Sequence, residues 1–595
     1  MKKKHILSVL AMAAVTFGVT ACADTDAQYS IPDVDAPHFV KSTPAIGDNH
    51  VKRGEVTVTV KYDKRIFFAS QDKDLIEATG ATITNANVYG ADSLLTMTVN
   101  IPNRGADVNI TIPAGVVTNG QGKPADAVTL NFKTTGLDAS PVMATSTAAT
   151  QLYQFLVQNA DTKIISGMMA NVAWNHTCAD KVNEWTGKYP AINGFDYVHM
   201  PACKAGANWI NYKDITPVKE WYDNQGIVQM MWHWNVPKTK PATAGKVIPS
   251  DWSGFLQLTD DNTKAVFSGY YMIGDNTKAA FANAQVGDQL VVTISDVAEG
   301  AQGSIKNSSW TGFVDEAGTN WEYFDISGNQ YSMNLDATTL ADMKGNGFIL
   351  SGHDYTITGV YVIPAGKELT DGTQIYKPSS NLDPNNDYTF NTANTTFDAA
   401  NALTEGTWEN EVWKDDMKTL KEYLTLLKNA NIPVLWRPFH EASGKWFWWG
   451  KDAESFKNLW KEMFKELKEA GFDNLIWVWT SCGNDNDWYP GDEYVDVVAR
   501  DLYGDNAASC ATEYADLTAT YGNKIVTLGE CGYSEYTNSR IANISEQWEA
   551  GAKWSWFMVW YDNDDAENQH ATQEWWQNAM TQPNIITRDM VPNMK

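Results

Sequence analysis

Two glutamates are best placed to do chemistry, because each closes an apolar segment that predicts a buried strand. Glu441 closes residues 433–441 and Glu530 closes residues 525–530. A lone carboxylate in such a position more often pairs with a neighbouring Arg or Lys. Two carboxyl groups about 5 to 5.5 Å apart, one protonated and one ionised, can instead cleave a glycosidic bond with retention of configuration. Aromatic residues near the two glutamates favour this second interpretation.

A scaffold must bring these two segments together. From residue 152 onward, apolar runs alternate with amphipathic helical patterns, which is typical of βαβ units and a parallel sheet. We predict helices at 412–430 and 453–470, and strands at 163–168, 195–199, 227–232, 432–436, 475–479, 495–502, 524–528 and 555–560. Eight such strands predict an α/β fold, the TIM (β/α)8 barrel, whose active sites lie at the carboxyl ends of the strands. Strands four and seven face each other across its mouth, so the two carboxylates can approach.

About 200 residues separate the third and fourth predicted strands, many more than a βα unit needs. Residues 240–375 are rich in Gly, Asn, Asp and Thr and alternate apolar with polar residues, which predicts an inserted β-sandwich. The catalytic barrel is then discontinuous, with residues 147–238 joined to 376–590. Short alternating runs also predict a small β-sandwich at 35–136. This segment resembles the immunoglobulin-like domains found behind bacterial lipoprotein anchors, and we interpret it as a spacer.

The N-terminal segment predicts export. Three lysines precede an apolar run at 6–19, which is shorter than a membrane-spanning helix requires. The run ends in a pattern that resembles a bacterial lipobox, so residues 1–22 are predicted to be a lipoprotein signal with Cys22 as the site of lipid attachment. An ordinary cleaved signal peptide is the alternative. We expect a cell-surface or outer-membrane lipoprotein of a bacterium, or otherwise a secreted protein.

The charge of the chain limits its partners. Lys and Arg number 45 against 72 Asp and Glu, a formal charge of −27, which opposes nucleic acid and anionic membrane surfaces. Membrane contact is therefore expected only through the lipid anchor, and we expect a monomer. Five cysteines remain after Cys22, none at zinc-site spacing, so no metal and no cofactor are predicted. Cys178 and Cys203 follow the first two predicted strands and could form a disulfide.

One motif resembles a known family. Residues 437–450 closely resemble the signature of glycoside hydrolase family 26, most of whose members are β-mannanases. The resemblance covers both barrel segments, including residues 165–170, 488–491 and 494–496, and does not extend to the N-terminal sandwich. It implies a retaining mechanism with Glu441 as general acid/base and Glu530 as nucleophile.

This division of roles requires the pKa values of the two carboxyl groups to differ. We expect the pKa of Glu441 to be the raised one, because Phe439, Trp446, Phe447 and Trp448 could surround it with apolar ring surface.

The resemblance implies further site residues. Arg437 and His440 match residues that bind substrate or orient the carboxylates, and Tyr503 matches a tyrosine that hydrogen-bonds the nucleophile. Asp501 is expected behind these groups. His233 resembles a residue in the sugar site beside the cleaved bond, and a purely structural histidine is the alternative.

Tryptophan supplies the candidate sugar platforms, because an indole face packs against the C–H face of a pyranose. Trp446 and Trp560 are predicted for this role in the barrel, with Trp556 as a competitor of Trp560. In the insert, Trp310 and Trp321 are candidate sugar-binding residues, which would make the insert similar to a carbohydrate-binding module. A structural lid or spacer is an equal alternative.

These observations predict a retaining, endo-acting hydrolase of β-1,4-mannosidic bonds in mannan, glucomannan or galactomannan, with the polymer or manno-oligosaccharides as partner. The alternatives are a family 26 enzyme that acts on β-1,3-xylan or mixed-linkage glucan, an exo-acting mannobiohydrolase, or a non-catalytic surface protein that binds glycans. Paired glutamates at strand ends argue against the last of these. The large insertion keeps exo action open.

Overall fold

The computed structural model describes residues 31–68, 73–89, 92–241, 245–258, 264–267, 270–273, 283–376, 382–562 and 570–595. The predicted signal segment and Cys22 lie outside these residues, so export and lipidation stay predictions. In the part of the chain that is described, each helix is too short or too polar to cross a membrane.

Eight parallel strands close into a barrel, in the order β10-β11-β12-β26-β27-β28-β29-β31 and back to β10. Their bounds are β10 (Ile164–Met169), β11 (Ile192–Asp196), β12 (Ile227–Trp232), β26 (Val434–Pro438), β27 (Leu475–Ser481), β28 (Val497–Tyr503), β29 (Ile525–Ser534) and β31 (Trp556–Val559). Most of these strands are buried along their whole length, as expected for a parallel sheet covered by helices. The predicted TIM barrel is confirmed.

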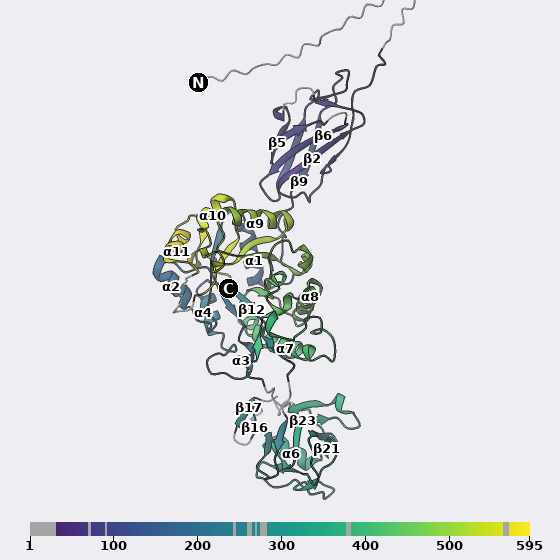
Figure 1. The fold of residues 1–595 in the computed structure, drawn as a ribbon, viewed down its shortest axis with the longest axis vertical. Coiled ribbons are helices and arrows are strands. Elements are labelled where there is room, and N and C mark those ends of the chain that lie inside the picture. The colour runs from purple at the N-terminus through teal and green to yellow at the C-terminus, as the bar shows by residue number, and fades with distance from the viewer. Residues whose placement is uncertain are drawn as a thin grey trace, which may run out of the picture. The chain divides into compact units, whose positions relative to one another are not determined.

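Helices surround the barrel, as Figure 1 shows. They are α1 (Thr147–Asn159), α2 (Thr177–Thr186), α3 (Met200–Lys204), α4 (Thr216–Asp223), α7 (Trp408–Asn429), α8 (Ala453–Glu469), α9 (Ala507–Thr520), α10 (Ile544–Ala550) and α11 (Gln573–Met580). The two helices predicted from the sequence are α7 and α8. Each begins at a side-chain cap, Thr407 for α7 and Asp452 for α8, which accepts a backbone N–H of the first turn.

Two strands differ from the sequence prediction in a way that affects the site. Strand β11 ends at Asp196, whereas the prediction placed it at 195–199, because the buried run continues past the strand into Tyr197 and helix α3. Strand β29 continues to Ser534, so Glu530 lies inside it. The register between β28 and β29 shifts there, because Arg500 pairs with Leu528 while Asp501 pairs with Glu530.

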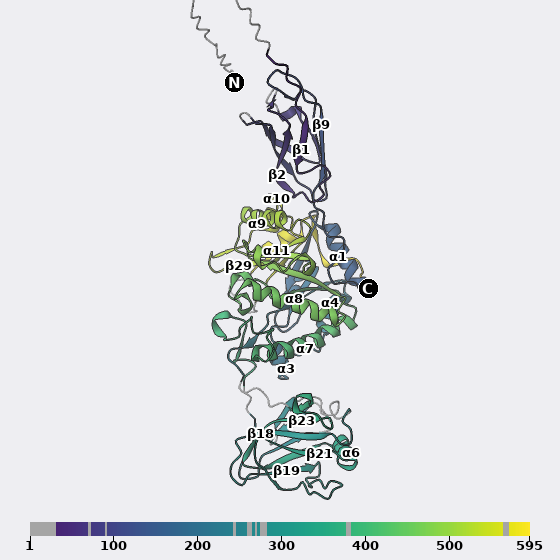
Figure 2. The ribbon, with the colours of Figure 1, turned by 90° about the vertical axis from the view of Figure 1, so that its right-hand side faces the viewer.

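The segment between β12 and β26 contains two further antiparallel sheets, one ordered β14-β23-β18-β21 and the other β17-β16-β15-β22-β19-β20. The first comprises β14 (Lys246–Ile248), β18 (Gln289–Ser295), β21 (Gln330–Asn334) and β23 (Tyr355–Ile363), with β24 (Thr373–Tyr376) beside β23. The second comprises β15 (Phe255–Leu258), β16 (Lys264–Phe267), β17 (Tyr270–Ile273), β19 (Gln302–Asn307), β20 (Phe324–Asp325) and β22 (Phe348–His353). Figure 2 shows helix α6 (Ala337–Asn346) beside these strands, and residues of both sheets and of α6 contribute to one apolar core.

A short ladder joins the two ends of this insert. Strand β13 (Val236–Pro237) leaves the barrel just after β12 and pairs with β25 (Tyr388–Thr389), where the chain returns. The insert is thus tied at the carboxyl end of the third barrel strand.

Residues 55–134 form most of a separate compact unit. Its antiparallel strands are β1 (Phe39–Thr43), β2 (Gly54–Tyr62), β3 (Phe67–Phe68), β4 (Glu77–Thr79), β5 (Thr82–Asn87), β6 (Leu94–Ile101), β7 (Asp107–Ile112), β8 (Val117–Thr118) and β9 (Val128–Lys133). Buried and exposed residues alternate along β9, as the sequence pattern indicates. Its likeness to an immunoglobulin-like domain stays a prediction.

The disulfide suggested for Cys178 and Cys203 is absent from the described residues. The Cys203 thiol instead lies 3.2 Å from both the backbone nitrogen of Tyr212 and the hydroxyl of Tyr423.

Candidate active site

Three carboxylates meet at the carboxyl ends of the barrel strands. Glu441 follows β26, Asp501 lies in β28 and Glu530 lies in β29, and one oxygen of each is within 4.8 Å of the others. The two glutamates that the sequence singled out are therefore brought together across the barrel mouth. The separation is close to the one that a direct attack by one carboxylate requires.

Arg437 supplies the positive charge among these carboxylates. Its fully buried guanidinium donates to Glu530 Oε1 at 2.5 Å, to Asp501 Oδ2, and to Thr480 Oγ1 at 3.0 Å. A buried carboxylate is stabilised in its ionised form by such charge-assisted bonds. The guanidinium group of Arg437 thus partly neutralises the charge of this acidic cluster.

Glu530 receives a second donor. The Tyr503 hydroxyl donates to Glu530 Oε2 at 2.8 Å, and His440 Nε2 lies 3.7 Å from Oε1. Burial and the charges of Glu530 and Asp501 raise the pKa of Tyr503 well above its usual value, so its hydroxyl stays a donor. The two side chains that donate hydrogen bonds to Glu530, Arg437 and Tyr503, favour its carboxylate over the acid.

The backbone at Glu530 depends on Gly529. Gly529 is the extra residue of the β28–β29 register shift, and a Cβ there would come within 2.7 Å of Asp501 Oδ1 and 2.9 Å of the Ala499 side chain. Such an unpaired residue bends the strand and redirects its side chains. Glycine thereby lets Glu530 reach Arg437 and Tyr503 without displacing Asp501.

Glu441 is held differently. Its backbone is in the left-handed region, with φ 52° and ψ 31°, and Phe439 and Lys445 also have positive φ. Bulky residues rarely adopt this conformation, and clusters of it are typical of functional sites. The indole nitrogen of Trp446 donates to Glu441 Oε2 at 2.9 Å and fixes the carboxyl group from the open side.

The two glutamates differ in pKa as the chemistry needs. Burial, followed by the charges of Asp501 and Glu530, raises the pKa of Glu441 well above its usual range, and Arg437 opposes this shift. Burial and Asp501 also raise the pKa of Glu530, to about 7, against the lowering effect of Arg437. Glu530 has the direct bonds to Arg437 and Tyr503, so it is the group that ionises first.

The sequence-based reason for the raised pKa of Glu441 is only partly right. Trp446 contacts the carboxyl group, but Phe439 packs against Trp232 and Trp448 packs against Trp234, in the core. Two of the four predicted rings thus pack into the core, and burial remains the first cause of the raised pKa of Glu441. The carboxylates of Asp501 and Glu530 are a cause that the sequence analysis did not identify.

His233 lies beside the catalytic groups. Its ring is 4.2 Å from His440 and 5.9 Å from Trp560 between centroids, and its Nδ1 bonds the carboxylate of Asp196. Burial, with His233 and Arg437 nearby, lowers the pKa of His440 well below its usual value, so that imidazole is neutral. Asp196, which also accepts the backbone N–H of His233 at 3.1 Å, was missed because β11 had been placed three residues too late.

The tryptophans predicted as sugar platforms differ in how much of their side chain is exposed. Trp446 is 47% exposed beside Glu441, and Trp560 is half-buried beside His233, whereas Trp556 is fully buried in the barrel interior. Trp556 therefore cannot contact a glycan. In the insert, Trp310 is 47% exposed, but Trp321 packs against the sandwich core and donates its indole N–H to Asp315 at 3.1 Å. Trp321 is partly buried, as Trp560 is, and its part in sugar binding stays a prediction.

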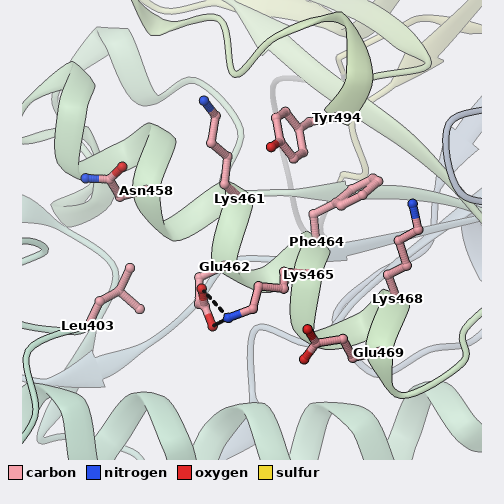
Figure 3. A pocket seen from close by; sticks show the side chains of 9 residues that line it. All are labelled: Leu403, Asn458, Lys461, Glu462, Phe464, Lys465, Lys468, Glu469 and Tyr494. Carbon is pink, nitrogen blue, oxygen red and sulfur yellow. Dashed lines mark hydrogen bonds and ion pairs between the residues drawn. The ribbon is translucent and has the colours of Figure 1, made fainter.

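A hollow of about 540 Å³ lies elsewhere on the barrel, along helix α8 (Figure 3). It is lined by Leu403, Asn458, Lys461, Glu462, Phe464, Lys465, Lys468, Glu469 and Tyr494. Solvated Lys and Glu side chains form most of its wall, and Glu462 and Lys465 pair with each other at 3.0 Å. It contains none of the groups described above, so we assign it no role.

The comparisons with known proteins agree with this geometry. The model of glycosyl hydrolase family 26 matches residues 142–268 and 374–590, which leaves out the second part of the insert. Mannan endo-1,4-beta-mannosidase B of Piromyces sp is 31% identical over 209 residues, 35% of this chain and 35% of that protein. Mannan endo-1,4-beta-mannosidase of Bacillus subtilis (strain 168) is 34% identical over 163 residues, 24% of this chain and 44% of that protein. The chain thus matches less than half the length of either relative.

Among solved structures, the GH26 domain of an endo-beta-mannanase/endo-beta-glucanase from Prevotella bryantii is 31% identical. The alignment covers 76% of this chain and 99% of that domain, with a TM-score of 0.49.

Proposed function

Because the chain belongs to glycosyl hydrolase family 26, we propose that it hydrolyses internal β-1,4-mannosidic bonds of mannan, glucomannan or galactomannan with retention. The observation that carries the proposal is the pair Glu441 and Glu530, with carboxyl oxygens within 4.8 Å and different hydrogen-bond partners. The names of the relatives support mannan as the substrate.

In the proposed first step, Glu530 attacks the anomeric carbon while Glu441 gives its proton to the leaving oxygen. The bond from carbon to the leaving oxygen breaks as the ester bond to Glu530 forms. Arg437 and Tyr503 hold the Glu530 carboxylate in position for the attack. In the second step Glu441 removes a proton from water, the water oxygen bonds to the anomeric carbon, and Glu530 leaves as a carboxylate.

Substrate contacts are proposed for the remaining groups. Trp446 presents an exposed indole next to Glu441, and His233 lies between contacts with His440 and Trp560. Indole faces pack against pyranose C–H groups, whereas the imidazoles hydrogen-bond sugar hydroxyls.

The first test measures reducing ends released from mannan, glucomannan, galactomannan, β-1,3-xylan and mixed-linkage glucan. We expect cleavage of the mannan polymers alone, with a range of oligosaccharide sizes from the earliest times and β-anomers as the first products. Release of mannobiose alone would identify an exo-acting enzyme. Preferred cleavage of xylan or mixed-linkage glucan would show that this polymer, and not mannan, is the substrate. Binding without release from any polymer would overturn the enzymatic proposal.

We also propose that the chain is exported and carries a lipid on Cys22, on the basis of the lipobox-like sequence. Cell fractionation tests this, since Cys22→Ala should move the protein from the membrane fraction to the soluble fraction. The same distribution of the natural and the Cys22→Ala protein between the membrane and soluble fractions would contradict lipidation.

A further inference from the structure

The insert carries three large aromatic side chains that remain exposed. Trp252 is 44% exposed, Trp310 47% and Tyr323 53%, whereas most tryptophans of the barrel are fully buried. Exposed rings that are gathered in one place are a common mark of a binding surface.

These rings border one face of the insert, the outer face of the sheet that contains β15, β22 and β19. Leu256, Leu350 and Ile305 point from these strands into the sandwich core. Successive side chains of a strand point to opposite faces, so Phe255, Ser351 and Ser304 point outward. Phe255 pairs with Ser351 and Ser351 pairs with Ser304, so the three form one row across the sheet.

Aromatic contacts flank this row on both sides. Trp252 lies 4.5 Å from His353 and 5.4 Å from Tyr323 between ring centroids, and Trp310 lies 4.9 Å from Phe255. On the same face, the ammonium group of Lys306 lies 5.0 Å from the centre of the Tyr323 ring. The face therefore combines ring surfaces with side chains that donate hydrogen bonds.

Two features of this face raise the free energy of the folded insert. Trp252 has φ 61° and Trp310 has φ 64°, a left-handed backbone that bulky residues rarely adopt. Ser304 is fully buried, and its hydroxyl has no hydrogen-bond partner within the described part of the chain. Strained backbone is concentrated at functional sites, and an unsatisfied buried polar group in a native structure calls for an explanation.

We propose that this face binds the backbone of an uncharged β-linked hexose polymer, with Trp252, Trp310 and Tyr323 as stacking platforms. Indole and phenol rings match the C–H faces of pyranoses, while Lys306 and His353 offer polar groups to sugar hydroxyls. The strong negative charge of the chain disfavours an anionic polymer.

The polymer proposed for this face is the mannan that the barrel cleaves, so this part of the inference rests on the proposed function. A second site on the same polymer raises the local concentration of substrate for the first without any new contact in the cleft. The gain is largest for insoluble mannan, whose chains cannot diffuse to the enzyme.

The test uses the full chain in a Glu530→Gln background, which stops hydrolysis, and measures depletion of the protein by insoluble mannan. We expect the double substitution Trp252→Ala and Tyr323→Ala to weaken binding about tenfold, because the barrel cleft contributes equally to both chains. Tyr361→Ala is the matched control. Tyr361 is a half-buried aromatic on β23, in the opposite sheet, and its loss should leave binding unchanged.

The same substitutions in the active chain separate this proposal from the proposed function. We expect Trp252→Ala with Tyr323→Ala to keep the rate on soluble mannohexaose and to lose several-fold on insoluble mannan. Unchanged binding and unchanged rates in a chain that cleaves mannan would overturn the binding face and leave the enzyme intact. Weakened binding in a chain that cleaves no polymer would support the binding face and refute the enzyme. Equal losses with Tyr361→Ala would also overturn the proposal, because they would show general damage to the insert.

Discussion

Glu530→Gln is expected to abolish turnover on every polymer that the natural chain cleaves, by about four orders of magnitude or more. Glutamine has nearly the same shape and still faces Arg437 and Tyr503, so the fold and polymer binding should persist. It cannot form the ester that carries the sugar between the two steps. Initial rates of reducing-end release, with thermal unfolding of both proteins alongside, check this expectation.

Tyr503→Phe is the graded control for this prediction. It removes the hydroxyl that donates to Glu530 Oε2 but leaves the carboxylate and Arg437 in place. Loss of a donor to the ionised form raises the pKa of Glu530, so the acid side of the rate profile should move to higher pH while substantial activity remains. A Glu530→Gln protein that retains as much activity as Tyr503→Phe would show that Glu530 is not the nucleophile.

Glu441→Gln is expected to lower kcat/KM on polysaccharide by about 10² to 10⁴, the usual worth of general acid–base catalysis. The loss should depend on the leaving group. A substrate with an acidic leaving group, such as a dinitrophenyl β-mannobioside, needs little protonation and should still react with Glu530. The sugar–enzyme ester should then accumulate, and added azide should release it, because azide needs no general base.

The pH profile gives a second readout of Glu441. The natural chain needs Glu530 ionised and Glu441 protonated, so its rate should fall as pH drops through the pKa of Glu530 and again as pH rises through that of Glu441. Burial and Asp501 raise both values, so the active range lies above that of ordinary carboxyl groups. Glutamine has no proton to lose, so the fall at high pH should vanish in Glu441→Gln. Its persistence would assign the acid to another residue.

The barrel was predictable because a parallel sheet covered on both faces needs continuous apolar runs, and such runs are visible in the sequence. The ends of the strands were less predictable. The run at the second strand continues through buried Tyr197 into α3, so the strand was placed too late and Asp196 was not recognised as the partner of His233. The register shift at Gly529 depends on its neighbours in β28 and has no local sequence signal.

In the site, residue types at strand ends were enough to find Glu441 and Glu530. The bond from Tyr503 to Glu530 was expected from the family resemblance. The bonds of Arg437 to Glu530 and Asp501 were not predictable in geometry, because the three residues come from three different strands. Tryptophan content likewise does not tell which indoles face the core. The sequence analysis named Trp310 and Trp321 in the insert, whereas the fold also exposes Trp252 and packs part of Trp321 against the sandwich core.

The ladder between β13 and β25 bears on the order in which the parts of the chain fold during synthesis. Strand β12 pairs with β26, which follows it by about 200 positions, so the first three barrel strands must wait for their neighbour while the ribosome completes the intervening segment. Strands β14 to β24 find their partners within that segment. Once the insert has formed, its stem holds Val236 beside Thr389, and the longest connection of the barrel becomes a short one. An inserted sandwich of this kind is therefore expected to assemble during synthesis before the barrel closes.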